Sequence, residues 1–241
     1  MNDLAFIRYQ LKGVDALKFL QGQVTVHVER VPSDVPCYTA ICDLKGRIQF
    51  GLWLKQYDPE HFEIVVTQNQ SEEFAKHIKK YGAFSKMTLS DPSTVYPKFN
   101  AENTVFVEQA TDLTAWQLHA IELGQAFIEQ STAHEFQPQE LRLHQRAGIH
   151  YDKGCYLGQE IVARLWFKAK PKHWLHLVEG QGAVPNMGEK LSSDVQIVNS
   201  AAYGEGFKAL VVAKPESITA LGLHIVDLPD ALNGDVARPK T

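Results

Sequence analysis

The chain has 241 residues, of which 44% are hydrophobic and 22% are charged, and its formal net charge is −4. This length accommodates one large domain or a main domain with a smaller one, and the composition excludes disordered and fibrous proteins. The acidic balance argues against broad electrostatic binding to nucleic acid, although it leaves room for a local basic patch. The sequence contains neither a signal-peptide pattern nor an apolar stretch long enough to cross a bilayer. We therefore expect a cytoplasmic protein without a membrane partner.

The first 150 residues mix helical and strand patterns and contain no internal repeat. In chain order they predict a helix over 14–21, a hairpin over 36–54 with its turn at 43–46, a strand over 62–67, a helix over 70–81, a strand over 104–108, a helix over 112–123 and a short helix over 138–146.

Single residues carry some of these predictions. Val14 lies on the apolar face of the first helix, and Gly22 should end that helix in the left-handed conformation. Asn69 should cap the helix over 70–81, whose apolar stripe includes Tyr81. Trp116 lies on the apolar stripe of the helix over 112–123, and on this pattern alone it is a core residue.

After Lys170-Pro171-Lys172 the sequence changes to short strands separated by glycine turns. The segments are 173–180, 190–200, 203–213 and 221–229. This pattern is typical of a small all-β barrel or sandwich. We therefore expect a domain boundary near residue 170, which divides the chain into 1–170 and 171–241.

Motifs of several common enzyme classes are missing from the sequence. It has no G-x-S-x-G elbow, no H-E-x-x-H and no G-x-G-x-x-G after a strand. Its three cysteines are an odd number and provide no disulfide framework. Cys37 and Cys42 lie five apart on a predicted strand, so their side chains point to opposite faces and are interpreted as packing residues. His173 and His176 also have an odd spacing on a predicted strand, so their side chains point to opposite faces and we expect no metal site.

The stretch "YDKGCYLGQE", residues 151–160, is arranged around a cysteine. Gly154 and Gly158 let the backbone turn tightly around Cys155. Lys153 and a helix that starts near Gly158 would both stabilise a thiolate. Two interpretations stay open: Cys155 is a reactive thiol, or it fills a gap in a glycine-rich turn.

The octapeptide "KGCYLGQE" resembles the signature K-G-C-Y-x-G-Q-E of the YgfZ-type folate-binding proteins, which are relatives of the T protein (aminomethyltransferase) of the glycine cleavage system. Further stretches follow the order and spacing of that family: "FLQGQVT" at 19–25, "CDLKGRI" at 42–48, "KKYGAFSKMTL" at 79–89, "FQPQELRL" at 136–143 and "EIVAR" at 160–164. The resemblance covers residues 4–178. The residues of the signature loop are Lys153, Gly154, Cys155, Tyr156, Gly158, Gln159 and Glu160.

The resemblance implies an α+β, ring-like aminomethyltransferase fold with a central cavity that holds tetrahydrofolate, followed by a shortened C-terminal β-barrel. It implies that the signature loop lies at the rim of this cavity, with Cys155 as the functional thiol and Lys153 beside it. Gln159 and Glu160 would fix the loop or receive a partner. Family members support the assembly or repair of iron–sulfur enzymes, including some that modify tRNA. The expected partners are therefore folate and iron–sulfur client enzymes or assembly proteins, without direct contact to nucleic acid.

Three residues are candidates for holding the folate. Two aromatic positions that line the family's folate site align with Phe6 and Trp116, and stacking on such side chains stabilises flat pterin and benzoyl rings. Arg142 follows Pro138 near the signature and could bind the glutamate carboxylate of the folate, with a surface ion pair as the alternative.

The sequence departs from true T proteins at one catalytic position. Their catalytic aspartate has no counterpart around residues 60–70, so we expect no aminomethyl transfer in the cleavage system. Two functional classes stay open: a folate-dependent accessory protein for iron–sulfur enzymes, and a folate-dependent one-carbon transferase. A scaffold that holds its own cluster is disfavoured because the three cysteines are poorly placed for ligation.

Overall fold

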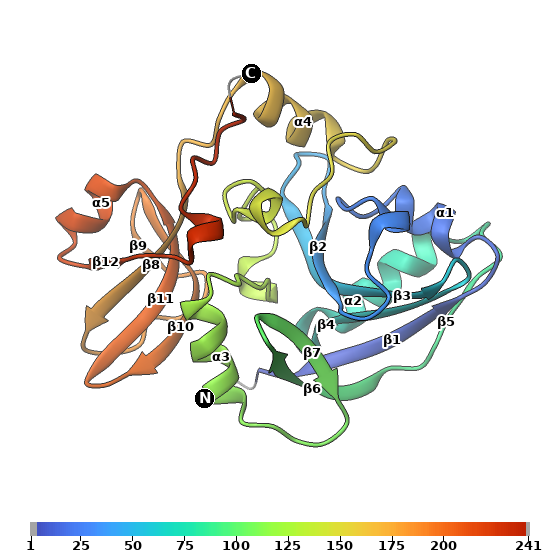
Figure 1. The fold of residues 1–241 in the computed structure, drawn as a ribbon, viewed down its shortest axis with the longest axis horizontal. Coiled ribbons are helices and arrows are strands. Elements are labelled where there is room, and N and C mark those ends of the chain that lie inside the picture. The colour runs from blue at the N-terminus through green and yellow to red at the C-terminus, as the bar shows by residue number, and fades with distance from the viewer. Residues whose placement is uncertain (1–3, 240–241) are drawn as a thin grey trace.

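The computed structural model describes residues 4–239. Two antiparallel sheets lie at opposite ends of the molecule, and α3 with the segment 124–150 lies between them (Figure 1). This arrangement is a mixed α/β architecture with curled antiparallel sheets, in agreement with the expected fold class.

The larger sheet has seven strands, in the order β2-β3-β4-β1-β6-β7 with β5 paired to β1. Their bounds are β1 (Phe6–Lys12), β2 (Cys37–Cys42), β3 (Ile48–Asp58), β4 (His61–Thr67), β5 (Thr88–Leu89), β6 (Ser93–Asn100) and β7 (Asn103–Val107). The predicted hairpin is confirmed as β2–β3, and Gly46 in its turn has a φ of 68°. This positive φ explains why the turn needs a glycine.

Helices cover both faces of this sheet. On one face α1 (Ala16–Gln21) and α2 (Gln68–Tyr81) bury Leu20, Phe74 and Ile78 against apolar strand residues. On the other face α3 (Leu113–Glu122) contributes Trp116 to an aromatic cluster. The observed α2 and α3 confirm the helices that the apolar stripes predicted over 70–81 and 112–123.

The C-terminal sheet has five strands in the order β12-β8-β11-β10-β9. Their bounds are β8 (Trp174–Gln181), β9 (Lys190–Ser192), β10 (Val195–Tyr203), β11 (Gly206–Ala213) and β12 (His224–Val226). One face packs on α5 (Pro215–Ala220), a helix that the strand pattern did not predict. The other face shares one core cluster with β2 and β3, so the two predicted parts of the chain stabilise each other. A division near residue 170 stays a prediction.

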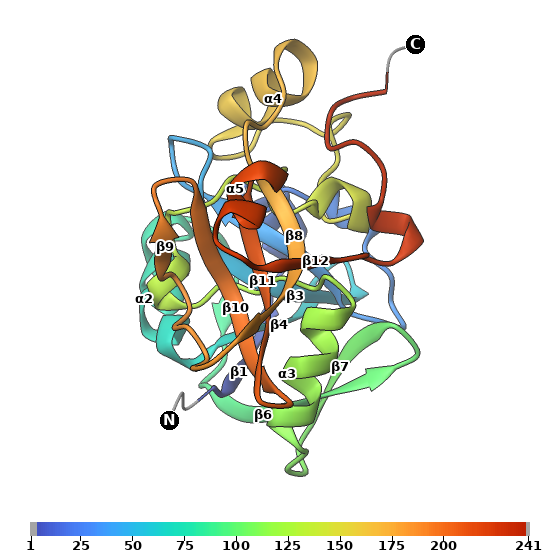
Figure 2. The same cartoon turned by 90° about the vertical axis from the view of Figure 1, so that its left-hand side faces the viewer.

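Five further helical segments lie within residues 4–239. They are η1 (Val28–Arg30), η2 (Gln130–Thr132), η3 (Leu143–Arg146), α4 (Gln159–Lys168) and η4 (Asp230–Leu232). Figures 1 and 2 both show α4 at the upper edge, clear of the two sheets. Across residues 4–239 no helix combines the length and the apolarity needed to cross a membrane.

Several local predictions are wrong. Val14 is 61% exposed because α1 begins only at Ala16, and Gly22 ends that helix with a φ of −84° instead of a left-handed conformation. Asn69 does not cap α2, whose first turn follows Thr67 without a side-chain cap, and Tyr81 is exposed.

The predicted helix over 138–146 is also wrong in its first half. Arg142 and Ala147 both have a φ of 56°, and these left-handed residues confine the helical hydrogen bonding to η3. Strands β1 and β6 were missed, although the alternation of Tyr9 and Leu11 with polar neighbours is a strand signal in β1.

Candidate functional site

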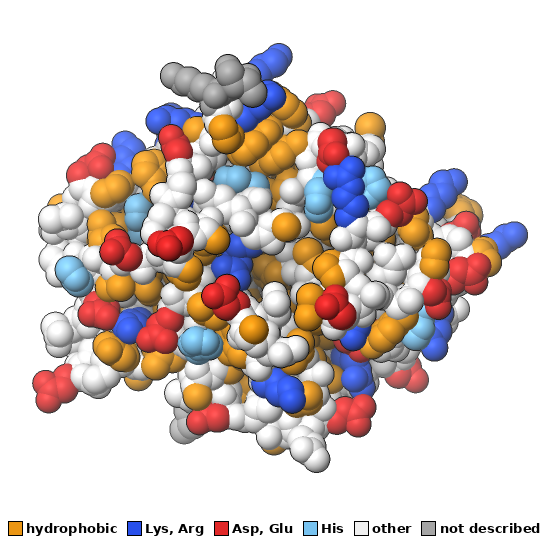
Figure 3. All heavy atoms as spheres, viewed as in Figure 1, with side chains coloured by type: hydrophobic (Ala, Val, Ile, Leu, Met, Phe, Trp, Pro, Cys, Tyr) orange, Lys and Arg blue, Asp and Glu red, His pale blue; other side chains and the backbone are white. Residues whose placement is uncertain are grey.

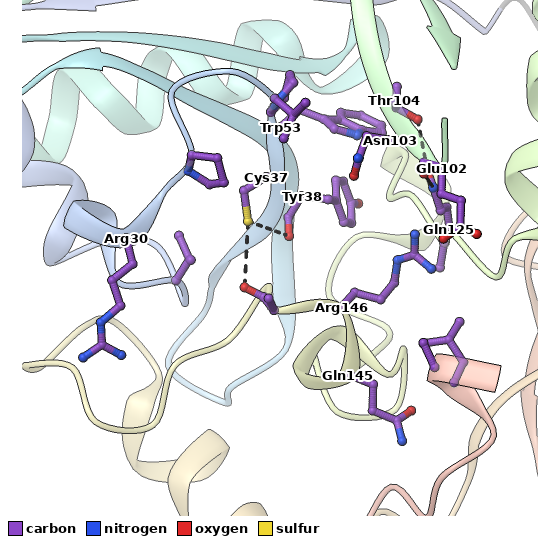
Figure 4. Close-up of a pocket in the computed structure, with 18 of the residues that line it drawn as sticks. Arg30, Cys37, Tyr38, Trp53, Glu102, Asn103, Thr104, Gln125, Gln145 and Arg146 are labelled. Atoms are coloured by element: carbon purple, nitrogen blue, oxygen red, sulfur yellow. Dashed lines mark hydrogen bonds between the residues drawn. The ribbon is translucent and has the colours of Figure 1, made fainter. Parts of the chain in front are cut away.

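A cleft of about 420 Å³ lies between the edge strand β2, the β6–β7 turn and η3 (Figure 4). Residues of η4 and of the segment 26–36 complete its wall. Its wall includes Cys37, Tyr38, Trp53, Gln125 and Arg146. The cleft therefore combines an aromatic surface, a thiol, an amide and a cation, and its volume lies in the range of small-molecule sites.

The aromatic surface comes from a cross-strand pair. Tyr38 on β2 and Trp53 on β3 are register partners, and their ring centroids lie 4.6 Å apart. The backbone N–H of Ile128 donates to the Tyr38 hydroxyl at 3.0 Å, which fixes the phenol ring in place. Neither Tyr38 nor Trp53 was singled out from the sequence as a ligand-binding residue. The signal that was available is the predicted hairpin, whose register places the two residues opposite each other.

Phe6 and Trp116 lie in the core behind this surface and do not line the cleft. Phe6 is fully buried and Trp116 is 4% exposed, with their ring centroids 5.1 Å apart in an edge-to-face contact. The Trp116 indole N–H donates to the Thr104 hydroxyl at 3.3 Å. Protein atoms therefore occupy the ring faces that a ligand would need. The structure assigns these two residues to the support of Trp53, whose ring centroid lies 5.5 Å from that of Phe6.

Arg142 also has a structural position. Its Nε donates to the Leu175 carbonyl at 3.0 Å and its Nη1 to the Gly234 carbonyl at 2.9 Å, so it ties η3 to β8 and to the C-terminal segment. Burial lowers the pKa of this guanidinium. Two other cations, Arg146 and Arg30, line the cleft instead, and the Arg146 Nη1 donates to the Leu123 carbonyl at 3.0 Å. Arg146 could not be identified from the sequence, because residue spacing does not predict the direction of a side chain that follows a left-handed residue such as Arg142.

The signature loop is docked onto the β2–β3 turn through two glycines. Gly158 has a φ of 78°, and a Cβ atom there would lie 2.3 Å from the Asp43 carbonyl oxygen. A Cβ atom on Gly46 would lie 2.8 Å from the Cβ of Ile161. The stretches "CDLKGRI" and "KGCYLGQE" therefore meet backbone to backbone, which explains the glycine in each of them.

Lys153 points inward, away from the predicted role of stabilising a thiolate. Its Nζ donates to the carbonyls of Gln21 at 2.8 Å and Val26 at 2.9 Å, and to that of Val24. It also lies 4.8 Å from the centroid of the Tyr156 ring. Burial lowers the pKa of Lys153 to about 7, whereas three carbonyl acceptors favour the ammonium form, which alone has three N–H donors. The structure therefore assigns Lys153 to holding the loop.

Cys155 is the exposed cysteine, whereas Cys42 is buried and Cys37 is half-buried. A Cβ atom on the neighbouring Gly154 would meet nothing within 4 Å outside residues 153–155, so this part of the loop is open to solvent. Cys155 does not line the cleft, but Cys37 does, and burial raises the pKa of the Cys37 thiol to about 11.

The segment before the signature connects the loop to the cleft. His150 lines the cleft and accepts the backbone N–H of His27 at 3.0 Å through Nδ1. Asp152 forms a two-pronged ion pair at 3.0 and 2.8 Å with Arg30, another lining residue. The loop is thus anchored beside the cleft, while its cysteine is exposed and is not a lining residue.

The other signature residues support the loop. Tyr156 is buried in the core cluster shared by both sheets, and burial raises the pKa of its hydroxyl. Gln159 and Glu160 begin α4, and Glu160 is exposed. Within residues 4–239 no group of three histidine, cysteine or acidic side chains is placed to hold a metal ion.

We expect Gly158→Ala to lower the free energy of unfolding by about 2 kcal/mol or more, because the methyl group meets a carbonyl oxygen and the left-handed conformation penalises an L side chain. Gly154→Ala in the same loop is the matched control and should change stability by less than about 0.5 kcal/mol. Urea denaturation of both variants measures the difference. Equal stabilities would show that the loop does not depend on this backbone contact.

No protein-family model matches the chain. The tRNA-modifying protein YgfZ of Serratia proteamaculans is 30% identical over 233 aligned positions, covering 74% of this chain and 70% of that protein. The tRNA-modifying protein YgfZ of Photobacterium profundum is 26% identical over 281 aligned positions, covering 92% of this chain and 85% of that protein.

Among solved structures, the glycine cleavage system aminomethyltransferase T of Bartonella henselae superposes with a TM-score of 0.68 at 10% sequence identity. The superposition covers 86% of this chain and 76% of that one. This likeness confirms the expected aminomethyltransferase fold. Together with the identity to the Serratia protein over more than two thirds of both chains, it shows that the chain belongs to the YgfZ family.

Proposed function

We propose that this chain binds tetrahydrofolate in the cleft and supports tRNA modification by maintaining iron–sulfur enzymes, with Cys155 as the working thiol. Curated relatives named tRNA-modifying protein YgfZ and the aminomethyltransferase fold support the class of function. The observation that carries the folate assignment is the cleft itself, where the Tyr38–Trp53 surface and the Arg146 cation line one cavity.

The lining residues fit the chemistry of a folate. A flat pterin or benzoyl ring would stack on Tyr38 and Trp53, and Arg146 would pair with a glutamate carboxylate. Asn103 lies on the same side of the cleft as Arg146 and offers an amide group for a polar ring edge, whereas the Gln125 amide is bonded to Glu102 and Thr104 (Figure 4). Bound tetrahydrofolate would supply a carrier for a one-carbon unit, and the residues of this chain would orient it.

The thiol is assigned to Cys155 on exposure. Of the three free cysteines it is the one that a partner protein can reach, and the loop at the neighbouring Gly154 is open to solvent. A thiol that acts on a client must be accessible in this way. Three free cysteines also suit the reducing cytoplasm, where we place this function.

The alternative of a one-carbon transferase lacks a supporting carboxylate. Among the described residues that line the cleft, Glu102 alone is acidic, and it is exposed on the β6–β7 turn. Glu63, from the segment where the T-protein aspartate was sought, is buried in a network with Gln10 and Tyr57 and does not line the cleft. We therefore keep the expectation that aminomethyl transfer is not the activity of this chain.

Calorimetric titration with tetrahydrofolate tests the cleft. We expect Arg146→Gln to weaken binding about tenfold or more, because a charge-assisted hydrogen bond is lost, and Trp53→Phe to weaken it less. Arg164→Gln on α4 and Trp174→Phe on β8 are matched controls outside the cleft and should bind like the wild type. Wild-type affinity in both cleft variants would place the folate elsewhere.

Genetic complementation tests the thiol. In a strain that lacks the gene, we expect the wild-type chain and Cys37→Ala to restore iron–sulfur enzyme activity and tRNA modification, and Cys155→Ala to fail at normal protein levels. Cys37→Ala is the informative control because it removes the thiol that lines the cleft. Full rescue by Cys155→Ala would assign Cys155 a structural role.

A further inference from the structure

The part of α4 after Glu160 and the segment that follows the helix form a cationic surface. From 161 to 178 the chain has no aspartate or glutamate, but it has Arg164, Lys168, Lys170 and Lys172. All four side chains are exposed. This local excess of positive charge contrasts with the net charge of −4 of the whole chain.

The cations surround an exposed aromatic ring. Arg164 and Lys168 are one helical turn apart, about 6 Å along the axis, and line a shallow groove with Phe167. Phe167 is 49% exposed, and the guanidinium of Arg238 from the C-terminal segment lies 4.8 Å from its ring centroid. Figure 3 shows hydrophobic atoms flanked by lysine and arginine side chains at this upper edge of the molecule.

Among residues 4–239, none of the five cations is in an ion pair, whereas Lys76 on α2 pairs with Glu72 at 2.8 Å and Glu73 at 2.9 Å. The groove contains one carboxylate, Glu160, at the start of α4. An anionic partner would relieve the repulsion that remains between the cations.

The inner face of α4 is firmly seated, so the cationic face has a fixed direction. Trp166 stacks on Tyr151 with centroids 4.4 Å apart and an interplanar angle of 5°. Val162 is buried, and its carbonyl accepts the Gln139 side-chain amide at 2.7 Å. Arg164 and Lys168 are thus presented on a seated helix, as a preformed binding surface requires.

We infer that this surface, defined by Arg164, Phe167, Lys168, Lys170, Lys172 and Arg238, binds the phosphate backbone of RNA. Lysine and arginine supply the phosphate contacts, and the exposed face of Phe167 suits stacking by an unpaired base. The choice of RNA over an acidic protein rests on the proposed function in tRNA modification. The inference departs from the expectation of no direct nucleic-acid contact, because net charge averages over the surface and conceals a local excess.

Fluorescence anisotropy with a labelled, unmodified tRNA transcript tests this surface. We expect binding whose log K falls with log salt concentration, by about 0.7–0.9 per phosphate contact. Arg164→Gln/Lys168→Gln should bind several-fold more weakly, with a slope reduced by about 1.5. Lys79→Gln/Lys80→Gln removes two exposed lysines from α2 and is the matched control, which should keep the wild-type slope.

Three outcomes would overturn the inference: no tRNA binding by the wild-type chain at low salt, equal slopes in the α4 variant and the wild type, or a loss of binding in the α2 variant alone. Binding of anionic phosphatidylserine vesicles through α4 in place of tRNA would assign the surface to a membrane. Calorimetry with tetrahydrofolate on the α4 variant separates the two proposals. Normal folate affinity with lost tRNA binding in this variant supports both, whereas wild-type tRNA binding that the α4 substitutions weaken, without folate binding by either protein, rejects the cleft assignment alone.

Discussion

The insertion of the Lys153 ammonium into a cup of three backbone carbonyls is the contact on which the candidate site depends. The carbonyls belong to Gln21, Val24 and Val26, in the segment where the chain leaves α1 and meets β2 through an isolated bridge between Val24 and Ile41. One side chain thus joins the signature loop to the first helix and to the loop that closes the cleft. A buried charge is stable only when it is hydrogen-bonded in this way, so the loop has little freedom to move while Lys153 stays in place.

This constraint explains why the signature contains residues of such different character. Lys153 and Tyr156 point inward and anchor the loop, and Gly158 allows it to approach the β2–β3 turn. Gly154 and Cys155 remain on the outside. The neighbours of Cys155 are thus fixed by contacts with the rest of the protein, and Cys155 itself is left exposed. The ion pair between Arg30 and Asp152 holds the same segment beside the cleft.

Much of the fold could be predicted because it is encoded locally. The alternation and turn residues of β2–β3, the apolar stripes of α2 and α3, and the glycine-separated strands after residue 170 are all short-range patterns. The family resemblance supplied the tertiary arrangement that such patterns lack.

The candidate site was harder to predict because it depends on side-chain direction in loops. Lys153 and Cys155 are two residues apart, yet one is buried and the other exposed, and no periodicity applies in an irregular loop. The same holds for Arg142 and Arg146, which the left-handed conformation of Arg142 directs to different neighbours. Phe6 and Trp116, the predicted folate contacts, do not line the cleft, and both rings contact Trp53, which does.

The free energy of unfolding of Lys153→Met tests the central role of this lysine most directly. Methionine keeps the side chain as far as Cε but removes the ammonium group with its three donors, so the carbonyls of residues 21, 24 and 26 lose their partner. Lys172→Met, at an exposed position without an ion pair among the described residues, is the control. The account predicts a loss of about 2 kcal/mol or more for Lys153→Met and a negligible change for the control. Equal stability of the two variants would show that the carbonyls are satisfied without Lys153 and would contradict the account.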